Sequence, residues 1–147
     1  MNLQTARSTI ETYLAANWTH TPIRWQNVQA VTLGTPVQQT LEFGQTDYLA
    51  ADIDIIDSRT VTVPARCIRY GGLLIFSVCV KQGKGASIVD QYGDQLINLF
   101  ENKTLGTSPD VLRIRNLTGS TIYNAETSWY VNLLQFAFYF NRIVPNP

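Results

Sequence analysis

The sequence predicts an α+β domain in which a mainly antiparallel sheet of about four to six strands carries two helices packed on one face. A largely apolar run, Leu73–Val80, is typical of a strand that is buried on both faces. Two other stretches place apolar side chains at helical spacing, and several more alternate between apolar and polar residues as strands do. The 147 residues contain no repeat and no linker, so we expect a single domain over residues 1–147.

Charge is sparse and balanced along the chain. Charged residues make up 15% of the sequence, which is below the usual quarter. We therefore expect other subunits to cover part of the surface, with loops rich in Thr, Asn and Gln as the alternative source of polarity. Eleven basic residues cancel eleven acidic ones, which argues against a free-standing nucleic-acid binder. No signal-peptide pattern and no membrane-spanning apolar run is present, which favours synthesis in the cytoplasm and no membrane partner.

The N-terminal part predicts one helix and two strands. Leu3–Asn17 has an apolar stripe at helical spacing and ends before Pro22, which cannot continue the helix. Ile23–Asn27 alternates as a short strand, and Tyr48–Asp57 alternates as a half-buried one. The stretch Thr32–Thr46 is longer than a connection needs. It is either a contact arm or a surface insertion.

The middle of the chain predicts a hairpin. Strand character resumes over Thr60–Val63 after a turn, and Gly71 with Gly72 predicts the next two-residue turn. That turn would place Cys67 and Cys79 on opposite sides of the sheet, where they cannot form a disulfide. Both cysteines are expected to be reduced core residues.

The C-terminal half predicts a second helix and two further strands. Ser87–Asn102 has a broad apolar stripe, and its first serine with Asp90 predicts an acidic variant of the capping box. Val111–Arg115 predicts a strand, and Leu117–Glu126 predicts a polar turn. Trp129–Val144 is apolar at both strand parities, so it must be covered on both faces.

The order of these parts resembles a known family. The motifs that carry the resemblance are Pro22–Asn27, Gly72–Val78, the Gly83–Gly85 turn, Leu99–Leu105, and Trp129 with Tyr130. Together they resemble the tail terminator proteins (tail completion or neck proteins) of long-tailed bacteriophages, which are related to the minor tail protein U of lambda-like phages. The chain departs from the family in its extended Leu33–Thr46 segment.

The resemblance implies a structural virion protein without catalysis, cofactor or metal. Such a subunit assembles into a hexameric ring that caps the tail tube, stops its polymerisation and offers a head-tail joining surface. The implied partners are further copies of the chain, the tail tube protein and a head-side connector or neck protein. DNA would pass through the ring without specific binding.

Residues that would supply the subunit contacts follow from charge, polarity and strand position. Asp52 and Asp54 share one face of a strand, and we hypothesise that they repel DNA passing through the ring lumen. A metal or acid-base role for this pair has no recognisable second ligand cluster beside it. The full set of expected interface residues is Asp52, Asp54, Arg66, Arg69, Arg113, Arg115, Gln38, Gln39, Phe138 and Phe140.

Two alternatives remain open. The first is another neck component of the virion, such as a head-closure or tail-assembly protein. A small-ligand or nucleotide-binding module would use Gly83–Ser87, but Lys84 is followed by Gly85 where a phosphate loop has Ser or Thr. His20 is the single histidine, and it forms no recognisable nucleophile pair with either cysteine.

Overall fold

The computed structural model describes residues 1–26, 31–32, 35–36, 47–61, 67–125 and 129–143. The helices and strands of these residues form an α+β arrangement, in which a run of strands follows each helix. In chain order they are α1 (Leu3–Asn17), β1 (Ile23–Trp25), β2 (Val31–Thr32), β3 (Thr35–Pro36), β4 (Tyr48–Val61), β5 (Cys67–Lys81), α3 (Ser87–Phe100), β6 (Thr104–Thr107), β7 (Asp110–Ala125) and β8 (Trp129–Ile143).

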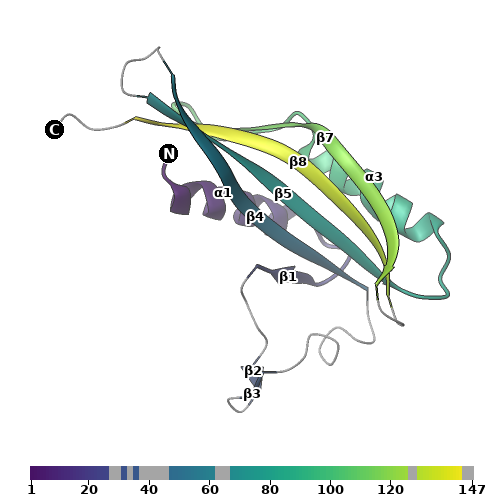
Figure 1. Cartoon of the computed structure of the whole chain (residues 1–147). Helices are drawn as coiled ribbons and strands as arrows, with labels where there is room; N and C mark the ends of the chain where they lie inside the picture. Colours follow the sequence, from purple (N-terminus) through teal and green to yellow (C-terminus); the bar gives the residue numbers. More distant parts are fainter. Residues whose placement is uncertain (27–30, 33–34, 37–46, 62–66, 126–128, 144–147) are drawn as a thin grey trace.

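One curled, six-stranded sheet has the order β1-β4-β5-β8-β7-β6 (Figure 1). Strand β1 runs parallel to β4, with Ile23 opposite Leu49 and Trp25 opposite Ala51, while the other neighbours are antiparallel. The predicted mainly antiparallel sheet is therefore wrong, because the sheet is mixed. Alternation of side chains reports which face is buried and not which way a strand runs. The long connection before Tyr48 provides the crossover that a parallel neighbour requires.

Strand β5 is continuous through Gly71 and Gly72, so the predicted hairpin turn is wrong. It pairs with β4 on one side and with β8 on the other. A Cβ at Gly72 would collide with the carbonyl oxygen of Asp54 and with the ring of Phe138, which explains why glycine stands here. Cys67 and Cys79 are both free and buried, and both lie on β5. The expectation that a hairpin turn places them on opposite sides of the sheet is therefore wrong. The two cysteines lie about 40 Å apart along β5, which excludes a bridge for a different reason.

Several other boundaries differ from the prediction, because bulges keep polar stretches within long strands. Strand β4 continues through the turn predicted at Asp57 and Ser58, with a shift of register just before it, between Ile55 and Asp57. Strand β7 runs through most of the predicted turn Leu117–Glu126, with two register shifts near Leu117. The predicted Ser87 cap is wrong, because Ala86 holds the N-cap position and makes no side-chain hydrogen bond. The predictions of helix Leu3–Asn17 and of a long C-terminal strand are confirmed.

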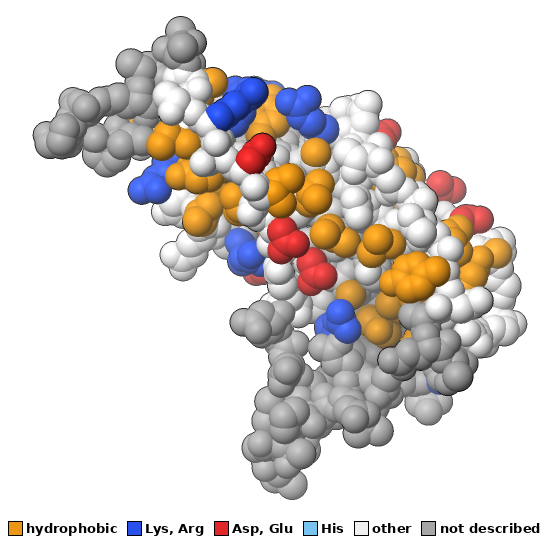
Figure 2. Space-filling model, in the orientation of Figure 1, with side chains coloured by type: hydrophobic (Ala, Val, Ile, Leu, Met, Phe, Trp, Pro, Cys, Tyr) orange, Lys and Arg blue, Asp and Glu red, His pale blue; other side chains and the backbone are white. Residues whose placement is uncertain are grey.

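Both helices pack on the same face of the sheet. They lie behind the strands in Figure 1, so the face shown in Figure 2 is the helix-free face. The Tyr13 hydroxyl of α1 donates to the Leu99 carbonyl of α3 over 2.7 Å, which ties the two helices together. Among the described residues, neither helix is long and apolar enough to cross a membrane.

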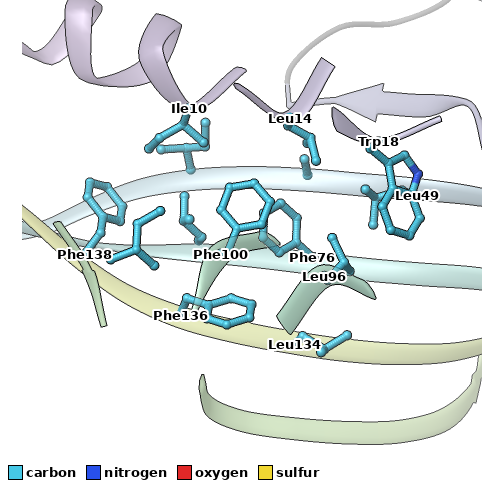
Figure 3. Close-up of a cluster of buried hydrophobic side chains, with 14 of the residues drawn as sticks. Ile10, Leu14, Trp18, Leu49, Phe76, Leu96, Phe100, Leu134, Phe136 and Phe138 are labelled. Atoms are coloured by element: carbon cyan, nitrogen blue, oxygen red, sulfur yellow. The ribbon is translucent and has the colours of Figure 1, made fainter. Parts of the chain in front are cut away.

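The core lies between these helices and the sheet (Figure 3). Ile10 and Leu14 of α1 and Leu96 and Phe100 of α3 are completely buried against it. Phe100 packs 4.9 Å from the ring of Phe76 at the centre of β5. Burying each of these side chains contributes about 1.5–3 kcal/mol, which fixes both helices on one face and leaves the other face free.

Candidate functional site

The helix-free face carries apolar side chains that no described element covers. Leu73 and Ile75 of β5 and Leu133 and Ala137 of β8 are half-buried at the positions that alternate with the core residues. Figure 2 shows apolar side chains on this face between acidic and basic groups. A sheet that is apolar on both faces is typical of a protein that packs against a partner. We call this surface the helix-free face below.

One end of the helix-free face is basic. The Arg69 guanidinium lies 4.6 Å from the centre of the Tyr139 ring, and that of Arg115 lies 5.0 Å from it. Arg69 also donates from Nε to the side-chain oxygen of Asn141 over 3.0 Å. These contacts hold the arginines in place, and a stacked guanidinium still presents N–H groups that match a carboxylate.

A small pocket of about 230 Å³ continues this basic end. Arg113 lines it and donates to the Thr104 hydroxyl over 3.4 Å, and Lys103, Arg115 and Tyr139 also line it. The structure thus gathers Arg69, Arg113 and Arg115, three of the expected interface residues, around one tyrosine. Sequence reasoning missed Tyr139 because its role depends on strands that are distant in sequence.

The acidic residues lie on β4. Asp52 and Asp54 are half-buried at alternate positions of the strand, so they share the helix-free face. Asp54 accepts a hydrogen bond of 2.9 Å from the Gln26 amide, whose oxygen accepts from Ile53 N over 2.9 Å and from Arg7 over 2.7 Å. This network fixes one carboxylate relative to helix α1. The described residues contain no group of three or more His, Cys, Asp and Glu side chains that would hold a metal ion.

The remaining expected interface residues do not join this surface. Phe138 and Phe140 are 2% and 1% exposed and belong to the core under the helices. The prediction that these two phenylalanines lie at a subunit contact is therefore wrong. Strand alternation shows which residues share a face of the sheet, but it does not show which face the helices cover. Gln38, Gln39 and Arg66 lie outside the described residues.

A second apolar cluster occupies the other end of the helix-free face. The Tyr48 and Trp129 rings meet edge to face at 5.0 Å, and the Lys81 ammonium lies 5.4 Å from the Trp129 ring. Burial raises the pKa of the Cys79 thiol, although a hydrogen bond with Tyr48 and the charge of Arg24 oppose that shift. The members of the cluster are Tyr48, Ala50, Cys79, Trp129 and Val131.

The glycine-rich turn before α3 borders an open pocket of about 460 Å³. Gly83 and Gly85 have φ values of 97° and 91°, so the turn requires glycine at both positions. Lys84 forms an ion pair of 3.0 Å with Asp47. This lysine therefore points to a carboxylate of its own chain, which favours a strand-to-helix turn over a phosphate loop.

Comparisons with known proteins place the fold and leave the function open. No family model matches the sequence, and no curated protein matches it. Solved structures do match, among them a chain that is 18% identical, with a TM-score of 0.62 and coverage of 99% of both chains. That chain has a name that describes no activity, and the likeness extends to the fold alone.

Proposed function

We propose that this protein is a structural virion subunit that forms a ring, caps the tail tube of a long-tailed bacteriophage and joins it to the head-side neck. The helix-free face is the observation that carries the proposal. Its half-buried apolar strip lies between Asp52 and Asp54 on one strand and Arg69 and Arg115 near the other end. Apolar contact area flanked by both signs of charge suits a surface that packs against a partner protein.

The family resemblance of the sequence provides the biological setting of this proposal. It makes the partners further copies of the chain in a ring of six, the tail tube protein and a head-side connector. In this setting the subunit performs no chemistry, and DNA passes through the lumen without specific binding.

The decisive experiment adds the purified chain to tail tube protein from the same phage while tubes polymerise. We expect the chain to bind tube ends as a ring and to stop elongation, which electron microscopy and tube-length distributions measure. A monomer in the absence of tubes is compatible with the proposal, because terminator rings can require the tube end. Unchanged tube lengths with unoccupied ends would contradict the proposal, and binding to the head-side connector alone would favour the other neck components.

The pocket beside the Gly83–Gly85 turn favours one further candidate, a small-ligand or nucleotide-binding module. Lys81 and Ala86, the residue directly before helix α3, line this pocket, and a lysine beside a helix start would attract an anion. Titration calorimetry with nucleoside triphosphates tests it directly. The assembly function predicts no heat of binding, whereas saturable heat that disappears in Lys81→Ala would favour the ligand-binding function.

A further inference from the structure

Strand β7 has an open outer edge over much of its length. The short strand β6 pairs only with Asp110–Arg113 at its beginning. Residues around the next turn satisfy a few more groups, because Ile114 N donates to Lys103 O and Leu117 N donates to Glu101. From Thr118 to Asn124, β7 pairs with β8 on its inner side, and no described strand lies along its outer side.

This edge lacks the features that protect edge strands from pairing. The segment Thr118–Asn124 contains no charged residue and no proline, and all its residues are exposed. It also exposes two large apolar side chains, Ile122 at 41% and Tyr123 at 43%. Soluble proteins normally guard such edges with charge, proline or a covering element. An uncharged open edge with apolar side chains therefore indicates that another strand pairs with it.

Among the residues that the structure describes, the opposite margin of the sheet has a second open edge of similar length. On the outer side of β4, β1 pairs only with Leu49–Ala51, and the side chains of Arg7 and Gln26 bond to Ile53. Beyond that point Ile55–Val61 lies exposed or half-buried along the margin. It exposes Ile55 at 36% and Ile56 at 61%, so the two open edges carry most of the large exposed apolar side chains of the described residues.

We infer that the Thr118–Asn124 edge of one copy pairs with the Ile55–Val61 edge of the next copy, so that the sheet continues across the subunit boundary. Strands β4, β5, β8 and β7 alternate in direction, so β4 and β7 run opposite ways and the new pair is antiparallel. The two edges are different surfaces on opposite margins (Figure 1), which makes the contact head-to-tail. Head-to-tail contacts build rings when the rotation closes. This contact deepens the proposed ring function and rests on it.

Cysteine cross-linking tests the contact in the full chain on tail tubes and at high concentration. The double variant Ile56→Cys with Ile122→Cys places one thiol on each edge, and a short bismaleimide joins thiols that meet. The native Cys67 and Cys79 are 1% and 5% exposed, so the wild-type chain provides the background control. We expect a ladder of covalent oligomers from the double variant and no oligomers from either single variant.

Each other outcome has a defined meaning. Dimers from the single variant Ile122→Cys would show that like edges pair, which overturns the head-to-tail contact. Rings that form without a ladder would overturn the contact and leave the ring function standing, whereas monomers that do not bind tubes would overturn both.

As a second readout, Ile122→Lys should weaken self-association at least about tenfold, because an edge lysine opposes pairing. Ala15→Lys on the exposed side of α1 is the matched control, and an equal effect of both lysines would also overturn the contact.

Discussion

Gly72 of β5 lies directly opposite Phe138 of β8, and the phenyl ring occupies the space that a side chain at position 72 would need. The ring is 2% exposed and stacks on Phe140 at 6.4 Å, so it has little room to move. We predict that Gly72→Ala lowers the free energy of unfolding by about 1–3 kcal/mol through overpacking. Urea unfolding followed by tryptophan fluorescence measures this change.

Gly119 of β7 is the matched control, because a Cβ there would meet no atom within 4 Å. Gly119→Ala should change the free energy of unfolding by no more than about 0.5 kcal/mol. Equal losses in the two variants would show that the Asp54 carbonyl and the Phe138 ring do not impose glycine at position 72.

The buried thiol of Cys79 makes stability depend on alkaline pH. Burial raises the pKa of this thiol above its ordinary value near 9, so the folded state favours the neutral form. The unfolded chain then loses its proton first, and the contribution to stability is complete below pH 9 and is lost as pH rises through the folded pKa. We predict that Cys79→Ala loses less unfolding free energy than the wild type between pH 7 and pH 10.5, measured in urea at both pH values. A parallel loss in both proteins would contradict the prediction.

The sequence predicts elements whose signal is local and misses those that depend on distant contacts. Helix α1 and strand β8 follow directly from the period of their apolar residues. Two consecutive glycines, Gly71 and Gly72, are a strong local signal for a turn, yet they lie within a strand. The reason is a contact with Phe138, which is far away in sequence and leaves no room for a side chain at position 72. The direction of β1 depends on the path of a long connection, which alternation does not encode.

The candidate site is predictable to the same extent. Alternation along β4 correctly places Asp52 and Asp54 on one face, because both lie on a single strand. The same reasoning groups Phe138 with Phe140 and does not reveal that helices cover their side of the sheet. Packing between elements decides which side of a strand is covered. The place of Tyr139 on the uncovered side, between the two buried phenylalanines, is therefore visible only in the folded sheet.

The acidic pair on β4 leads to a prediction about DNA. If Asp52 and Asp54 line the lumen of a ring, their charge keeps passing DNA from binding. We predict that tube-bound rings of Asp52→Lys with Asp54→Lys retain double-stranded DNA in filter binding, that retention falls as salt rises, and that wild-type rings retain little.

The control for this experiment is Asp90→Lys with Asp94→Lys, which makes the same change in net charge at exposed positions of helix α3. This second pair should leave DNA retention unchanged if the lumen is formed by the sheet. Retention by both pairs would indicate an effect of net charge alone, and retention by neither would refute the proposed role of the β4 carboxylates.

The ring of Tyr139 orders two of the arginines that are proposed to meet a neighbouring subunit. Tyr139→Ala removes both cation–π contacts, each worth about 0.5–1 kcal/mol at exposed sites, so we expect a loss of about 1–2 kcal/mol in unfolding free energy. Tyr139→Phe keeps the ring face under both guanidiniums and should stay within about 0.5 kcal/mol of the wild type. If the ordered arginines serve assembly, Tyr139→Ala also binds tube ends at least about tenfold more weakly, because Arg69 and Arg115 must then be ordered when the contact forms. Tube-end binding that is unchanged in a folded Tyr139→Ala protein would remove the basic end of the helix-free face from the subunit contact.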